Sequence, residues 1–157
     1  MRKQKGFSLI ELLIVVAIIL IIAAIAIPNL LRSRIAANEA SAVGSIRTIN
    51  TAEVTYSSTY PDCGFTSLTN LGGSGGNTTG AGLIDAVLAG GTKSGYSFGA
   101  VPTGGTGCGT GSPNSTYSVT GVPQSQQTGT RYFFSDQSGV IRYNATGVAT
   151  ATSSPLQ

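Results

Sequence analysis

The chain contains 157 residues, of which 41% are apolar and 10% are charged, and glycine accounts for 22 positions. This length allows one modest globular core plus one membrane or coiled-coil element, and the apolar content excludes a disordered chain. The net charge of +3 is concentrated at the start, because without Arg2, Lys3 and Lys5 six basic residues remain against six acidic ones. The composition therefore gives no support to a specific nucleic-acid-binding surface.

The first predicted element is an apolar helix over residues 7–27, interrupted only by Ser8 and Glu11. Its length of roughly 32 Å matches a hydrocarbon core of roughly 30 Å. The basic residues before it predict a cytoplasmic N-terminus and export of everything after Pro28. The alternative is a secretory signal peptide with a small-x-small cleavage site at residues 24–26.

Glu11 is the most informative residue of this segment, because a charge in hydrocarbon costs about 3 kcal/mol and requires a partner. Lys5 lies six residues upstream, and Arg32 is about 30 Å away at the other end of the helix. We therefore expect the partner to come from another molecule, most simply from a second copy of the chain.

At these residues, the sequence resembles the bacterial type IV pilin and pseudopilin family with its prepilin-type cleavage and methylation motif. The resemblance lies in a short basic leader ending at Gly6, followed by the sequence FSLIELL at residues 7–13 and an apolar helix, and it is close over about the first 35 residues. It implies that a prepilin peptidase of the inner membrane cuts after Gly6 and methylates the new N-terminus at Phe7. It also implies that Glu11 pairs with the terminal amine of a neighbouring subunit during assembly.

The physical chemistry of the segment agrees with these implied roles. Cutting after Gly6 removes the basic anchor and exposes an α-amino cation that can offset a buried Glu11 carboxylate. Packing of apolar helices against one another then supplies most of the cohesion between subunits. Glu11 would set the register between subunits, and the apolar residues would hold them together.

Pro28 predicts a kink in a continuing helix, although the alternative is that the helix simply ends there. Continuation is favoured because apolar residues recur at helical spacing after Pro28, with polar residues on the opposite side. The apolar residues are Ile35, Ala42, Val43, Ile46 and Ile49, and the polar residues are Asn38, Ser41, Ser45, Thr48 and Thr55. The helix is expected to end near Tyr56, with about 50 residues and about 75 Å of length.

From Tyr60 onward, Pro, Gly, Ser, Thr and Asn dominate and indicate a head of different character. Residues 61–95 are expected to form a long loop with a short helix at 83–88. Segments rich in aromatic and β-branched residues then predict four strands, at residues 96–101, 116–122, 130–135 and 140–144. The last two form the clearest hairpin.

The expected fold is α+β, with about four antiparallel strands packed on the second half of the long helix. The resemblance implies the same pilin-like fold. The expected parts of the chain are a leader at 1–6, a membrane or filament-core helix at 7–28, an amphipathic continuation at 29–60 and a head at 61–157.

Two cysteines, Cys63 and Cys108, stand far apart without metal-ligand spacing, and the chain has no histidine. No metal or cofactor is therefore predicted. In an exported head, a disulfide between them would close 44 intervening residues and stabilise the fold by up to about 4 kcal/mol. Two buried free thiols are the alternative.

Several observations point away from an enzyme: the chain has no histidine, no carboxylates paired by a motif, and no nucleophile with an evident base. The sequence and the resemblance together predict a structural subunit of a type IV pilus that serves adhesion, twitching motility or DNA uptake. The alternative is a pseudopilin of a type II secretion system. Expected partners are other copies in a helical polymer, the prepilin peptidase and the inner-membrane assembly platform. The expected location is the inner membrane first and the extracellular filament later.

Overall fold

The computed structural model describes residues 6–109 and 111–156. The chain divides into two compact units, Met1–Arg34 and Ile35–Gln157. The first unit is helical from Leu9 onward, and the second unit contains the hydrophobic core. The first five residues of the expected leader lie outside the described residues.

The longest element is helix α1, Leu9–Thr59, with 51 residues. It starts two residues later than expected, after Phe7 and Ser8. It continues through Pro28, so the alternative that the helix ends at the proline is wrong. It ends where Tyr60 precedes a proline, because a residue before proline is disfavoured in helical conformation.

Residues 35–59 of α1 bury one face of the helix in the second unit. Ala42, Ile46 and Ile49 are completely buried, which confirms the predicted apolar stripe, and Val43 packs partly buried against them. Burial of each isoleucine contributes about 2–3 kcal/mol to folding. The expectation for Ser45 was wrong, since it lies on the buried face.

The opposite face of this part of α1 is exposed and rich in threonine. The hydroxyls of Thr48, Thr51 and Thr55 each donate a hydrogen bond to the carbonyl four residues earlier, at 2.9–3.1 Å. These side chains therefore bond back to their own helix, which leaves a polar surface without charged groups apart from Arg47.

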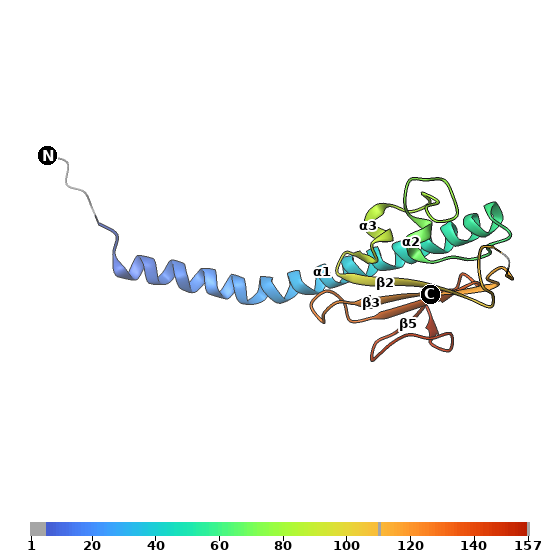
Figure 1. Ribbon diagram of the computed structural model, residues 1–157. Coiled ribbons are helices and arrows are strands. Elements are labelled where there is room, and N and C mark those ends of the chain that lie inside the picture. The colour runs from blue at the N-terminus through green and yellow to red at the C-terminus, as the bar shows by residue number, and fades with distance from the viewer. Residues whose placement is uncertain (1–5, 110, 157) are drawn as a thin grey trace. The chain divides into compact units, whose positions relative to one another are not determined.

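One antiparallel sheet of six strands has the spatial order β1 to β6. The sheet packs on the second part of α1 (Figure 1). The strands are β1 Thr92–Lys93, β2 Tyr96–Thr103, β3 Thr116–Pro123, β4 Tyr132–Asp136, β5 Arg142–Asn144 and β6 Ser154–Pro155. The four predicted strands are present, but the expected number of about four is too low. Strands β1 and β6 have only two residues each, too few to show an alternating pattern in sequence.

Alternate residues of the central strands point to the core. Phe98 on β2, Val119 on β3 and Phe133 on β4 are buried, and their neighbours along each strand are more exposed. Gly121 on β3 faces Ile46, and a Cβ at this position would come within 3.2 Å of the Ile46 Cδ1 atom. The missing side chain thus lets the helix approach the sheet closely.

The β4–β5 hairpin was predicted correctly. Its register pairs Tyr132 with Asn144 and Phe134 with Arg142. In the turn, the Asp136 carboxylate accepts a hydrogen bond from the Ser138 N–H at 2.9 Å, and Gly139 has a positive φ of 72°. A carboxylate that bonds two residues onward and a glycine in left-handed conformation are typical turn features.

Two short helices lie in the segment expected to be mainly loop. Helix α2, Leu68–Leu71, was not predicted. Helix α3 is Ala86–Ala89 rather than 83–88, because Asp85 caps it by accepting from the Leu88 N–H at 3.0 Å. The Leu83 N–H instead donates to the Leu71 carbonyl at 2.8 Å, which ties the segment back to α2.

Candidate functional site

The N-terminal segment that carries the motif is exposed and irregular up to the start of α1. Gly6, Phe7 and Ser8 have no regular secondary structure, and Phe7 is 85% exposed. A Cβ built on Gly6 would meet no atom within 4 Å. Exposed backbone without secondary structure is what a protease needs in order to bind and cut a chain.

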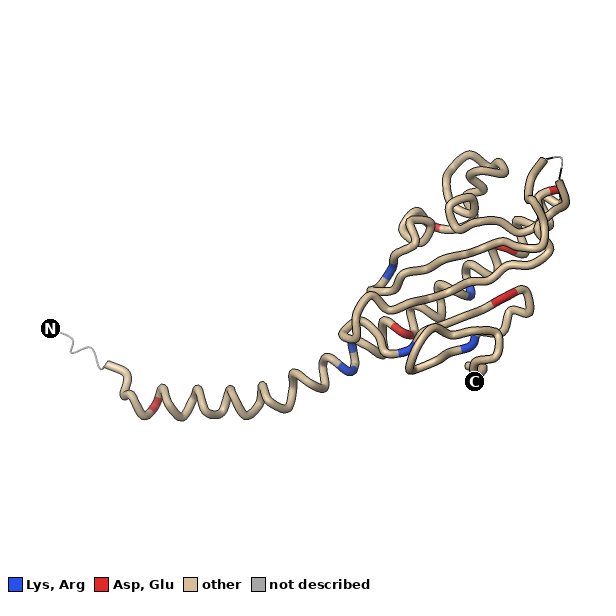
Figure 2. The backbone as a smooth tube through the Cα atoms, turned by 60° about the horizontal axis from the view of Figure 1, so that its bottom comes forward, with Lys and Arg blue, Asp and Glu red and all other residues tan. Residues whose placement is uncertain are grey.

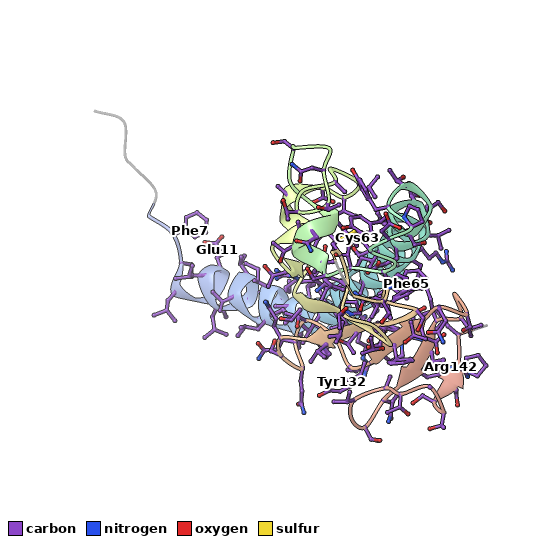
Figure 3. The ribbon with its side chains drawn as sticks, turned by 45° about the vertical axis from the view of Figure 1, so that its right-hand side comes forward. Phe7, Glu11, Cys63, Phe65, Tyr132 and Arg142 are labelled. Atoms are coloured by element: carbon purple, nitrogen blue, oxygen red, sulfur yellow. A yellow bond between two sulfur atoms is a disulfide. The ribbon has the colours of Figure 1, made fainter. Side chains whose placement is uncertain are left out.

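Glu11 lies in the first turn of α1, with Phe7 nearby at the start of the chain's described part (Figure 3). Its Oε2 atom accepts a hydrogen bond from the Ser8 N–H at 2.9 Å, and the Ser8 carbonyl accepts from the Leu12 N–H at 3.3 Å. A glutamate at the third helical position that bonds back to the residue before the helix is half of a capping box. The carboxylate also lies at the positive end of the helix dipole.

This capping bond was missed in the sequence, although the spacing Ser8-x-x-Glu11 is a known signal for it. It gives the isolated chain a local partner for Glu11. The partner is a neutral N–H, so the carboxylate charge is stabilised but not neutralised by it. A cation brought close to Glu11 would find one carboxylate oxygen, Oε1, without a hydrogen bond from the described residues.

The apolar side chains of residues 7–31 are exposed on all sides of the helix. The large apolar residues among them are 42–85% exposed, and α1 is long and apolar enough to cross a membrane. Only part of α1 can do so, because 51 residues rise about 75 Å. Soluble monomers rarely expose so continuous an apolar surface, so lipid or other protein must cover it.

The second unit contains a disulfide between Cys63 and Cys108, as predicted, with the sulfurs 2.07 Å apart. Backbone bonds reinforce it: the Phe65 N–H donates to the Asn114 carbonyl and the Asn114 N–H donates to the Cys63 carbonyl, both at 3.0 Å. Cys63 and Phe65 lie together at this end of the unit (Figure 3). The disulfide thus joins the end of α1 to the loop between β2 and β3.

Two buried glutamates on α1 were missed in the sequence. Glu39 accepts hydrogen bonds from the Thr130 N–H at 2.9 Å and from the Arg131 N–H and Nε at 3.2 and 2.7 Å. Burial alone would raise the pKa of Glu39, but the bonds from Thr130 and Arg131 outweigh burial and lower it. This carboxylate fastens α1 to the start of β4.

Glu53 is completely buried and far less well satisfied. Its Oε2 atom accepts from the Thr66 N–H at 3.0 Å, and its Oε1 atom has no hydrogen-bond partner within the described part of the chain. Burial raises the pKa of Glu53 to about 7, and the Thr66 bond opposes this only in part. The signal for both glutamates was their spacing, since positions 39, 42, 46, 49, 53 and 56 alternate by three and four residues.

The chain is similar to known proteins over part of its length. Residues 1–27 match the family described as the prokaryotic N-terminal methylation motif. The chain is 67% identical over 39 residues to the type IV wide pilus major component PilA4 of Thermus thermophilus, covering 25% of this chain and 30% of that protein. It is 42% identical over 88 residues to a fimbrial protein of Pseudomonas aeruginosa, covering 48% of this chain and 57% of that protein.

A third relative is the type II secretion system core protein G of Vibrio cholerae, 41% identical over 64 residues, or 39% of this chain and 44% of that protein. The chain thus spans between about a third and three fifths of the length of these relatives. No solved structure matches it significantly. The chain thus combines an exposed apolar N-terminal helix, long enough to cross a membrane, with a head built on an antiparallel sheet. Over the matched part of its length, the chain is similar to type IV pilus and fimbrial proteins and to a type II secretion protein.

Proposed function

We propose that this chain is the structural subunit of a type IV pilus, polymerised through its N-terminal helix, and that it is not an enzyme. The observation that carries the proposal is the exposed apolar segment of residues 7–31, which has one acid, Glu11, in the first turn of α1. The helix needs a covering and the acid needs a cation. A second processed copy of the chain supplies both.

The first step is processing by a prepilin peptidase in the inner membrane. Cleavage between Gly6 and Phe7 separates the leader, residues 1–6, and methylation then modifies the new terminus at Phe7. Support comes from the motif match over residues 1–27 and from the exposed, irregular backbone around Gly6. The leader is cytoplasmic at this stage, and the head of residues 61–157 lies on the other side of the membrane.

The second step is assembly at an inner-membrane platform, in which residues 7–28 leave the bilayer and form the filament core. The Phe7 amine of one subunit pairs with the Glu11 carboxylate of another. The Ser8 bond to Glu11 holds the carboxylate oriented at the helix start until that partner arrives. Residues 29–60 continue the helix beyond a kink near Pro28, whose nitrogen carries no hydrogen and so cannot donate a backbone hydrogen bond to the preceding turn. The filament serves adhesion, twitching motility or DNA uptake outside the cell.

A pseudopilin of a type II secretion system is the second candidate, and the match to the Vibrio cholerae protein favours it. That match covers a smaller share of this chain than the match to the fimbrial protein. The disulfide Cys63–Cys108 also favours the pilus, since major pseudopilins often lack cysteines.

Electron microscopy of filaments sheared from the cell surface, with N-terminal mass analysis of their main protein, tests the proposal. The expected result is long filaments whose subunit begins at a methylated Phe7. Short structures confined to the periplasm would favour the pseudopilin. A subunit cut at residue 26 would revive the signal-peptide alternative, and a subunit that still begins at Met1 would contradict the proposal.

A further inference from the structure

Two arginines stand at the end of the first unit of the chain. Arg32 and Arg34 are the first charged residues of α1 after Glu11, and both are exposed. Figure 2 shows the long stretch of α1 without charged residues that precedes the first basic residues of the helix. Among the described residues, the ion pairs are Lys93 with Asp85 and Arg131 with Glu39. Arg32 and Arg34 therefore have no acid of their own chain within ion-pair distance in the described structure.

Their position along the helix matches the depth of phospholipid headgroups. Residues 7–27 rise about 32 Å and fill the hydrocarbon core, and Arg32 follows Ile27 by about 8 Å. The two headgroup layers together add about 10–15 Å to the hydrocarbon core, so each layer is about 5–8 Å thick. A long arginine stem can lie along apolar surface and place its guanidinium at a chosen depth. The guanidinium of Arg32 lies at the depth of the lipid phosphates. The guanidinium of Arg34 can reach the same layer when its side chain extends toward the membrane.

The local chemistry favours phosphate as the ligand. A guanidinium offers a planar pair of N–H donors that fits two oxygens of one phosphate. Arg32 and Arg34 are two residues apart, so they project to nearly opposite sides of the helix and would contact separate lipids. Between Glu11 and Glu39 the sequence has no acid to compete for them.

We propose that Arg32 and Arg34 bind the phosphate groups of outer-leaflet phospholipids and fix the depth of the membrane-inserted subunit. The consequence concerns the processed chain. Removal of the leader takes away Arg2, Lys3 and Lys5, so the new Phe7 amine becomes the remaining cation on the cytoplasmic side. The two arginines then form the stronger electrostatic attachment of the subunit to the membrane. This attachment lies at the outer leaflet, on the side from which the subunit leaves the membrane.

The proposed lipid contact rests on the membrane orientation given under the proposed function, but its test needs no filament. The full processed chain, with ¹³C at every arginine Cζ, is reconstituted into washed vesicles of phosphatidylethanolamine and phosphatidylglycerol in phosphate-free buffer. Solid-state NMR then measures dephasing of the arginine ¹³C signal by lipid ³¹P. Wild-type chain is expected to show clear dephasing.

Three variants locate the contact. The double variant Arg32→Gln/Arg34→Gln is expected to lose most of the dephasing, whereas Arg47→Gln, which removes one arginine from α1 in the second unit, should keep it. The variant Arg32→Lys/Arg34→Lys keeps both positive charges but lacks the guanidinium groups. It should reduce the dephasing of labelled arginine as far as Arg32→Gln/Arg34→Gln does. A spin label at Ala36 should nevertheless stay at the same depth in the membrane as in the wild-type chain. Co-flotation with vesicles confirms insertion of every variant.

The proposal is overturned if wild-type chain shows no dephasing, if dephasing survives in Arg32→Gln/Arg34→Gln, or if Arg47→Gln abolishes it equally. A failure of the proposed pilus function would appear differently. In that case filaments or a processed Phe7 terminus would be absent from cells, while the lipid contact of the reconstituted chain would be unaffected.

Discussion

The two units of the chain differ in where their apolar side chains lie. In the first, isoleucine and leucine side chains such as Ile18 and Leu20 remain more than half exposed along the helix. In the second, Ile46 and Ile49 on the same helix are completely covered by the sheet. The second unit therefore carries its own folding free energy, whereas the first depends on lipid or on other copies for its covering.

This comparison also separates the roles of the acids on α1. Glu39 and Glu53 are buried in the second unit and act on the stability of the head. Glu11 lies in the first unit, where its bond to Ser8 is exposed. Changes at Glu11 should therefore affect assembly, and changes at Glu39 or Glu53 should affect folding.

The largest expected effect comes from Glu11. Both Glu11→Ala and Glu11→Gln should lower filament yield at least about tenfold, because a lost charge pair of about 1.4 kcal/mol or more acts at every subunit contact. Glutamine keeps an oxygen that can accept the Ser8 N–H, so only the alanine variant also loses the helix cap. Yield is measured by quantifying sheared filaments, with head stability as the control. Normal filaments from Glu11→Gln would show that the cap, and not the charge, is what matters.

The next effect is that of the disulfide in the second unit. Replacing Cys63 and Cys108 together by serine should lower the free energy of unfolding of the head by up to about 4 kcal/mol, since the open chain regains loop entropy. Thermal unfolding of the full chain in detergent should shift downward by on the order of 10 °C. Reduction of wild-type chain is the matched control and should give a similar shift. An unchanged midpoint would mean that the Asn114 backbone bonds suffice without the disulfide.

The contrast between the units can be tested with one type of substitution. Ile46→Ala should destabilise the head by about 2–5 kcal/mol, because it leaves a cavity in a closed core. Ile18→Ala, in the exposed first unit, should change head stability by less than about 0.5 kcal/mol. Both values come from thermal or denaturant unfolding of the head. Equal effects of the two substitutions would remove the distinction between the units.

A separate expected effect is the pH dependence caused by Glu53. The pKa of Glu53 is about 7 in the folded chain, against an ordinary value of 4.5. Between these two pH values, the folded chain therefore holds a proton that the unfolded chain has released. Stability from this group is complete below pH 4.5 and falls as pH rises to 7, by up to about 1.4 kcal/mol per pH unit.

Glu53→Gln should remove this fall and leave a variant at least as stable as wild type at pH 7.5. Unfolding midpoints measured from pH 4.5 to 8 test it. The reverse sign applies to Glu39, whose lowered pKa gives stability that is lost at more acidic pH. Parallel curves for wild type and Glu53→Gln would contradict the assigned role of Glu53.

Much of the fold could be predicted because its main signals are periodic or local. Residue spacing predicts three of its features: the N-terminal apolar helix, the buried stripe at Ala42, Ile46 and Ile49, and the β4–β5 hairpin. Strands β1 and β6 could not be predicted, because two residues form a strand only when a neighbour supplies hydrogen bonds. Helix α2 has the same difficulty, with four residues and no side-chain cap.

The candidate site was predicted less completely. The motif indicates Gly6, Phe7 and Glu11, but it does not indicate the hydrogen bond from the Ser8 N–H to Glu11, which depends on the separate helix-capping spacing Ser8-x-x-Glu11. Glu39 and Glu53 fell on the apolar stripe, where a charged residue is normally unfavourable. Hydrogen bonds from Thr66, Thr130 and Arg131 explain how these two carboxyl groups can be buried.

A filament structure by electron microscopy, at a resolution that shows side chains, would test the pairing between copies most directly. The distance to measure joins the Phe7 nitrogen of one subunit to the Glu11 carboxylate of its neighbour. We predict a separation within about 4 Å, the limit of an ion pair. A carboxylate that bonds only to Ser8 of its own chain, with the neighbouring amine far away, would contradict the account.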